Sequence, residues 1–114
     1  MPYLNIQTNR QIGVEKTETL LKTLSQSIAE ILGKSENYVM IALESGKPMI
    51  FAGNDAPSAY VELKSLGLPE DETPRFSASL CELIEHQTGI SKERIYIEFA
   101  HPERHMWGWN GKTF

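Results

Sequence analysis

The chain has 114 residues, a length typical of one domain that can bury its own core, and 15 acidic and 11 basic residues give it a net charge of -4. Its 40% hydrophobic and 23% charged residues are typical of a globular protein and exclude a disordered chain. Because no run of Lys or Arg is present, the sequence argues against nucleic acid or an anionic membrane as a partner. A single domain over residues 1–114 is the expectation.

The first half of the chain predicts a strand, a helix and a second strand. Apolar residues alternate over residues 3–8 and again over 38–44, as in strands that bury one face. Between them, residues 14–32 carry apolar residues every four positions, which places these residues on one face of a helix. Gly33 follows, where the end of a helix calls for a left-handed residue.

The second half predicts the same order of elements. Residues 58–66 and 94–100 have the alternation of strands, and residues 71–88 have the spacing of a helix. The segment 70–74 is expected to start that helix, because its acidic residues suit the positive end of the helix dipole and Pro74 is tolerated in a first turn.

The two halves match without a gap when the chain is laid against itself, which defines repeats 1–56 and 57–114. Each repeat is a βαβ unit with parallel strands, so the expected α/β fold, of α+β type, is a four-stranded sheet with two helices on one face. The matched residues are apolar helix positions, the glycine and serine that follow them, and alternating strand positions: Leu20, Leu24, Ile28, Gly33, Ser35, Val39, Ile41 and Leu43 with Phe76, Leu80, Ile84, Gly89, Ser91, Ile95, Ile97 and Phe99.

Residues 101–114 follow the last matched strand and lie outside the matched pattern of elements, and they contain two tryptophans and a terminal phenylalanine. Apolar side chains at a chain end must cover their own core or a neighbour, because they would otherwise form an association-prone patch. One face of the predicted sheet also lacks a helical cover. Oligomerisation would cover both the apolar chain end and the open sheet face.

Cysteine usage and the absence of targeting signals bear on location. The single cysteine, Cys81, excludes an intrachain disulfide and is expected to be a buried structural thiol. The apolar stretch 38–43 is far too short to span a bilayer, and the start of the chain resembles no signal peptide. A cytoplasmic protein without a membrane span is expected, with secretion by a route independent of a signal peptide left open.

Pro2 is the residue that points most directly to chemistry. If Met1 is removed, Pro2 becomes a free secondary amine at the head of a strand, and burial in an apolar site would lower the pKa of that amine toward a value suited to a general base. A retained Met1 would acylate the nitrogen and abolish its basicity. The ordinary alternative is a proline that simply starts a strand.

Several segments together resemble the macrophage migration inhibitory factor family, which names one branch of the tautomerase superfamily. The resemblance spans the whole chain with almost no insertion, and the order and spacing of the motifs make it specific. The motifs are MPYLNIQTN at 1–9, GKSENY at 33–38, SLG at 65–67, RIYI at 94–97, GWN at 108–110 and TF at 113–114.

The resemblance implies a homotrimer of ββαββα-type subunits with short additional C-terminal strands. Their sheets would form a central barrel, and the sites would lie at subunit interfaces. It also implies keto-enol tautomerase activity on phenylpyruvate or dopachrome-type compounds, with Pro2 as the general acid/base. Such a site needs no metal and no organic cofactor, and its expected partner besides a second subunit is a small keto or enol acid.

Substrate-binding residues follow from the same resemblance. Lys34 matches the lysine that binds the substrate carboxylate, and Tyr96 matches a tyrosine contributed by the neighbouring subunit. Trp109 and Phe114 match the hydrophobic wall, and Leu66 matches an isoleucine that lines the site. Each has a structural alternative: Lys34 complements a helix C-terminus, Tyr96 is an ordinary strand aromatic, and the tail aromatics pack.

Other positions have two interpretations or depart from the family pattern. Tyr38 is either a strand residue or part of the site. Glu98 replaces an asparagine at the far end of the substrate and is expected to disfavour acidic or electron-rich rings, while Trp107 replaces a smaller residue and would narrow the rim. Ser58 and Val61 replace the Cys-x-x-Cys pair, which argues against thiol oxidoreductase activity.

Two alternatives remain beside the tautomerase. The first is a cytokine-like protein that binds an unidentified receptor. The second is an enzyme that uses Pro2 on a different substrate, such as a small unsaturated acid. The second is less favoured, since no counterpart of the arginine used by such enzymes is evident. A metal site at His101 and His105 is disfavoured, because no further Cys or His clusters with them.

Overall fold

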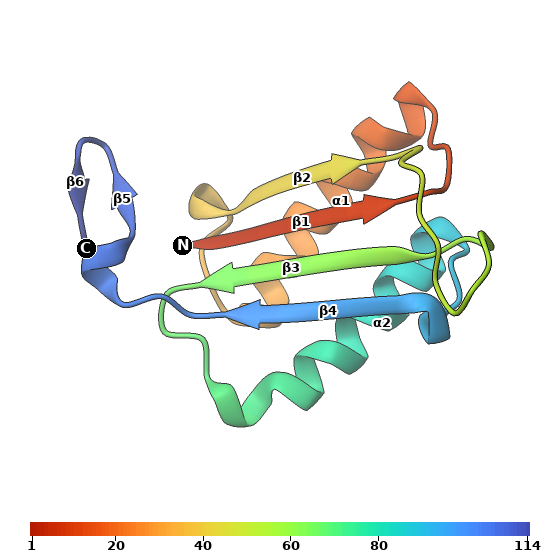
Figure 1. The fold of residues 1–114 in the computed structure, drawn as a ribbon. Helices are drawn as coiled ribbons and strands as arrows, with labels where there is room; N and C mark the ends of the chain where they lie inside the picture. Colours follow the sequence, from red (N-terminus) through yellow and green to blue (C-terminus); the bar gives the residue numbers. More distant parts are fainter.

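The computed structural model describes residues 1–114. Figure 1 shows one layer of sheet with two helices behind it and a small hairpin beyond one end. The elements in chain order are β1 (Pro2–Thr8), α1 (Val14–Leu32), β2 (Met40–Glu44), β3 (Ala59–Ser65), α2 (Thr73–Thr88), β4 (Ile95–Ala100), β5 (Gly108–Trp109) and β6 (Lys112–Thr113), with 3₁₀ turns at Glu36–Tyr38, Glu70–Glu72, Lys92–Arg94 and Arg104–Met106.

The sheet has the order β2-β1-β3-β4, which places the N-terminal strand at the centre. Each repeat supplies one parallel pair, β1 with β2 and β3 with β4, and the repeats meet where β1 and β3 pair in antiparallel fashion. Both helices cover the same face (Figure 1). The predicted four-stranded sheet with two helices on one face is confirmed. The element order is βαβ followed by βαβ, so the ββαββα order that the family resemblance implied was wrong.

Two predicted boundaries were wrong, each because a 3₁₀ turn precedes the element. Strand β2 begins at Met40 rather than at residue 38, since residues Glu36–Tyr38 form a turn in which Ser35 Oγ accepts a hydrogen bond from Asn37 N at 3.3 Å. Helix α2 begins at Thr73 rather than at residue 71, with the acidic turn Glu70–Glu72 before it and a proline in its first turn. The remaining ends shift by one residue or none.

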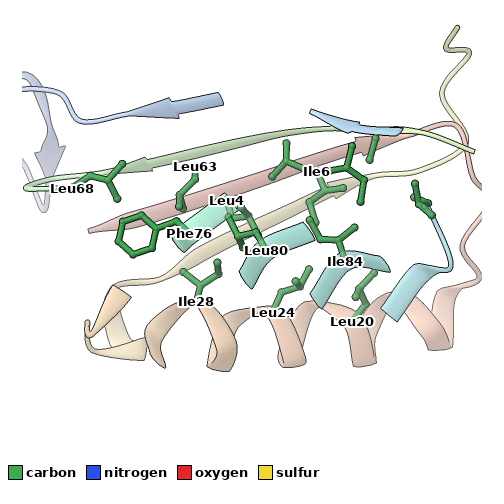
Figure 2. Packing of buried hydrophobic residues seen from close by; sticks show 14 residues of the cluster. Leu4, Ile6, Leu20, Leu24, Ile28, Leu63, Leu68, Phe76, Leu80 and Ile84 are labelled. Carbon is green, nitrogen blue, oxygen red and sulfur yellow. The ribbon is translucent and has the colours of Figure 1, made fainter. Parts of the chain in front are cut away.

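The core lies between the sheet and the helices (Figure 2). The six apolar helix residues that the repeat brings into register are all buried, as predicted, and each is at most 1% exposed: Leu20, Leu24, Ile28, Phe76, Leu80 and Ile84. Gly33 and Gly89 end their helices with φ of 64° and 76°, the left-handed conformation that glycine adopts without strain. Cys81 is only partly buried against this core, not fully buried as expected.

The opposite sheet face has no helical cover within the chain and is largely polar. Asn5, at its centre, donates Nδ2 to Glu44 Oε2 at 3.3 Å and to Glu62 Oε1 at 3.4 Å. On the neighbouring strand pair, the Tyr60 hydroxyl donates to Glu98 Oε1 at 2.7 Å. This face is therefore a hydrogen-bonded polar surface rather than an apolar one. Neither helix is long and apolar enough to span a membrane.

Candidate active site

Pro2 is the first residue of the central strand β1 and is buried. It lies opposite Ser65 in the antiparallel pair with β3, and the next residue of β1 pairs with Met40 of β2. A proline is tolerated as the first residue of a strand, because the N–H that it lacks is not needed there for a hydrogen bond to a neighbouring strand. The fold thus holds the start of the chain between two neighbouring strands.

A cavity of about 450 Å³ opens beside Pro2, and we call it the proline cavity. Its walls are mostly apolar and come from the chain start, the turn before β2, strand β3 and the C-terminal segment. Its lining includes Pro2, Tyr38, Lys64, Trp107 and Trp109. Pro2, Tyr38, Trp107 and Trp109 are four of the predicted site residues, and the structure brings them together.

A second cavity of about 380 Å³, the lysine cavity, adjoins the first. It contains the predicted residues Lys34, Leu66 and Phe114 together with Arg104. Met1 and two aromatic residues of the site, Tyr38 and Trp109, line both cavities. Removal of Met1 would therefore take away part of the lining of both cavities and leave Pro2 as the chain start.

The C-terminal hairpin carries the aromatic side of the site. Trp109 lies edge-on to Tyr38, with ring centroids 5.9 Å apart and an interplanar angle of 83°. The hairpin turns at Asn110 and Gly111, which have φ of 53° and 75°. Two successive positive φ values are the hallmark of a tight hairpin turn, for which Asn-Gly is the strongest sequence signal. Figure 1 shows β5 and β6 beyond the N-terminal end of β1.

The electrostatics of the two cavities favour a neutral amine and an anionic ligand. Burial, and then the positive charge of Lys34, lower the pKa of the Met1 amine, which is the terminal amine in this structure. Lys34 Nζ donates to the Leu66 carbonyl oxygen at 3.5 Å, which ties this lysine to the loop after β3. The cavities contain three cationic side chains, from Lys34, Lys64 and Arg104, and no Asp or Glu.

Tyr96 and Glu98 do not reach this site within one chain. Through Tyr60, Tyr96 is in register with Gln7, near the end of β1 that lies away from Pro2. The Tyr96 ring is 63% exposed and packs edge-on against Phe51, with centroids 4.9 Å apart. Neither Tyr96 nor Glu98 lines either cavity.

Sequence reasoning missed Lys64 and Arg104. The strand register pairs Lys64 with Tyr3 beside Pro2, so the alternation of β3 combined with the antiparallel pairing would have placed this lysine at the site. No comparable local signal exists for Arg104, since its segment was assigned no structure. Tyr38 ends a 3₁₀ turn, so its interpretation as a strand residue was wrong.

The residues set aside on sequence grounds lie elsewhere. Ser58 and Val61, at the positions of the absent Cys-x-x-Cys pair, are buried. His101 Nε2 lies 3.1 Å from Glu70 Oε2, and His105 Nδ1 lies 3.4 Å from Glu103 Oε2.

The similarity to known proteins extends over the whole chain. The family model described as macrophage migration inhibitory factor matches residues 1–114. A macrophage migration inhibitory factor homolog from Brugia malayi is 37% identical over 116 residues, with 100% of this chain and 99% of the relative covered. The mouse macrophage migration inhibitory factor is 30% identical over 115 residues, with 100% and 99% covered.

Solved structures agree with this fold. A macrophage migration inhibitory factor homologue from Prochlorococcus marinus is 44% identical with a TM-score of 0.91, and 98% of each chain is covered. The factor from Trichinella spiralis is 29% identical with a TM-score of 0.90, covering 98% of this chain and 99% of the other. The chain belongs to the macrophage migration inhibitory factor family of the tautomerase superfamily.

Proposed function

We propose that this chain is a keto-enol tautomerase for small aromatic keto acids such as phenylpyruvate, and that Pro2, freed by removal of Met1, is its general acid/base. The observation that carries the proposal is the position of the terminal amine. The amine of Met1 lies at two adjoining cavities, where burial and Lys34 lower its pKa. Removal of Met1 would place the Pro2 amine one residue further along in the same surroundings. A base of lowered pKa is neutral at a pH where an ordinary amine is protonated.

The reaction needs only one group that first accepts the proton and then donates it. Neutral Pro2 nitrogen takes a proton from the carbon next to the ketone, and the electron pair of the broken C–H bond forms the enolate. The resulting ammonium then returns the proton to the enolate oxygen, which gives the enol and restores neutral Pro2. The reverse sequence converts enol to ketone, so no cofactor is consumed.

The rest of the site supports binding of an aromatic keto acid. Lys34 supplies a positive charge for the carboxylate, beside the amine. Trp109 and Phe114 supply an aromatic wall for the substrate ring. Trp107 lines the proline cavity, where a larger side chain leaves less room at the rim.

We further propose that the working unit is a homotrimer in which a neighbouring chain contributes Tyr96 and Glu98. The sheet face without helical cover supports this proposal, because a second copy would cover it. Tyr96 is 63% exposed and Glu98 lies on the same face of the sheet, so both are open to a neighbour. Glu98 would then disfavour rings that carry a negative charge.

The experiment pairs mass spectrometry of the N-terminus with a phenylpyruvate enol-ketone assay. Wild type, Pro2→Gly and the loop control Pro48→Gly are compared. Loss of Met1, a fall in kcat/KM of about a hundredfold or more for Pro2→Gly, and normal activity for Pro48→Gly are expected. Equal activity of Pro2→Gly and wild type would refute catalysis by Pro2. An inactive des-Met protein that binds a protein partner specifically would favour the receptor-binding function that the relatives' names suggest.

A further inference from the structure

The cations at the site are more numerous than one carboxylate-binding lysine requires. The chain has a net charge of -4, yet the two cavities contain Lys34, Lys64 and Arg104 and no acidic side chain. Lys64 Nζ lies 3.7 Å from Glu62 Oε2, so its charge is partly balanced. Lys34 and Arg104 form no salt bridge within the chain. The lysine cavity therefore carries two uncompensated positive charges.

Arg104 stands on a backbone that is tied to the aromatic wall of the site. It opens the 3₁₀ turn Arg104–Met106, in which Trp107 N donates to the Arg104 carbonyl oxygen at 3.3 Å. Phe114 N in turn donates to the Trp107 carbonyl oxygen at 3.3 Å. The guanidinium and the aromatic ring of Phe114 thus reach the lysine cavity from one hydrogen-bonded unit.

We propose that Arg104 is a second carboxylate-binding residue, which holds the carboxylate of the keto acid together with Lys34. A guanidinium donates two parallel hydrogen bonds to one carboxylate, whereas an ammonium acts as a point charge. The inference rests on the proposed tautomerase function for its substrate class. The narrower claim that the lysine cavity binds a carboxylate depends only on the cavity and on its two cations without a salt bridge.

The two cations have separable effects. Burial and then the charge of Lys34 lower the pKa of the Met1 amine, and Arg104 is not among the causes. We expect the same division for the Pro2 amine once Met1 is removed. Arg104→Gln should therefore raise KM for phenylpyruvate about tenfold and leave kcat and the acidic limb of the pH profile unchanged. Lys34→Gln should change KM and also move the acidic limb. A purely structural role of Arg104 would not produce this split.

The kinetic experiment uses des-Met wild type, Arg104→Gln, Arg104→Lys and Arg10→Gln. Arg10 is an exposed arginine that lines neither cavity. Arg10→Gln removes one positive charge, as Arg104→Gln does, but leaves both cavities unchanged. Arg104→Lys keeps the charge but loses the paired hydrogen bonds and should fall between wild type and Arg104→Gln. Circular dichroism and thermal melting verify that each variant is folded. An unchanged KM in folded Arg104→Gln would overturn the inference.

A binding experiment decides the same question without catalysis. Calorimetry measures the affinity of phenylacetate, a monoanion, and of neutral phenylacetamide for the des-Met proteins. Arg104→Gln should weaken phenylacetate about tenfold and leave phenylacetamide unchanged. If wild type is inactive but shows this pattern, the tautomerase proposal fails and the carboxylate site stands. Equal phenylacetate affinity in wild type and Arg104→Gln, or no binding to wild type, would overturn the site.

Discussion

Trp109 stacks on Phe114, with ring centroids 6.2 Å apart and an interplanar angle of 17°. The two residues lie on opposite sides of the Asn110-Gly111 turn, so the hairpin itself brings the rings together. The pair lies outside the main core, and Trp109 is 46% exposed. Trp109 and Phe114 line the same cavity as Lys34 and Met1, so under the proposed function their rings offer an aromatic surface to a keto acid.

Trp109→Ala should impair binding more than it impairs folding. The indole lines both cavities but is half-exposed, so we expect KM for phenylpyruvate to rise about tenfold while the melting temperature falls by only a few degrees. Steady-state kinetics and thermal unfolding measure the two effects. Val14→Ala, at an apolar residue that is 79% exposed and lines neither cavity, is the control and should leave both unchanged. A Trp109→Ala protein with normal KM would remove this side chain from the site.

Lys34→Gln should move the acidic limb of the pH profile to higher pH. Protonated Pro2 cannot accept a proton, so kcat/KM rises as pH increases through the pKa of the amine. Lys34 lowers the pKa of the Met1 amine, and we expect it to act in the same way on the Pro2 amine that removal of Met1 exposes. Loss of Lys34 should therefore raise that pKa and require a higher pH for the neutral form. Profiles of kcat/KM from pH 5 to 9 test this, with Lys22→Gln on the exposed side of α1 as the control. An unmoved limb would show that Lys34 does not act on Pro2.

Mixing two inactive variants should restore activity if the site is shared between chains. In a trimer of Pro2→Gly and Tyr96→Ala subunits, about a quarter of the sites would combine an intact Pro2 with an intact Tyr96 of the neighbour, for equal amounts and random assembly. The variants are mixed, unfolded and refolded together, and the activity is compared with each variant treated alone. Light scattering gives the assembly size. A mixture no more active than its parts would refute the shared site.

Truncation of a buried helix residue should destabilise the chain strongly. Leu24 is fully buried between α1 and the sheet, so Leu24→Ala should lower the free energy of unfolding by about 2–5 kcal/mol. Val14 is 79% exposed, and Val14→Ala should change the free energy of unfolding by less than about 0.5 kcal/mol. Denaturant unfolding at one fixed protein concentration measures both, because association would add to the apparent stability. Equal effects at the two positions would contradict the observed core.

Cys81 should react slowly with alkylating reagents. Burial raises the pKa of its thiol, so a smaller fraction is thiolate near neutral pH than in a free cysteine. Modification by iodoacetamide at pH 7.5, followed by mass spectrometry, should be several times slower for the native chain than for the chain in denaturant. Equal rates would show that Cys81 is more accessible than the structure indicates.

The architecture was predictable because it depends on patterns within short segments. The spacing of Leu20, Leu24 and Ile28 defines a buried helix face wherever that helix packs, and Gly33 marks its end. Two copies of one strand, helix and strand order then leave few ways to form a sheet. The positions of the 3₁₀ turns escaped prediction, since the turn before Met40 depends on a local hydrogen bond and on the register of β2 rather than on periodicity.

The sequence by itself determined the helix and strand pattern, the core positions and the presence of Pro2 at the head of a strand. The family resemblance implied several neighbours of that proline, but only the tertiary structure showed how they meet and added Lys64 and Arg104. Lys34, Leu66, Arg104 and Phe114 are widely separated along the chain, and they meet because three chain segments end near the start of the central strand. Periodicity reports which side of an element is buried, whereas the distance between segments depends on how all the elements pack together.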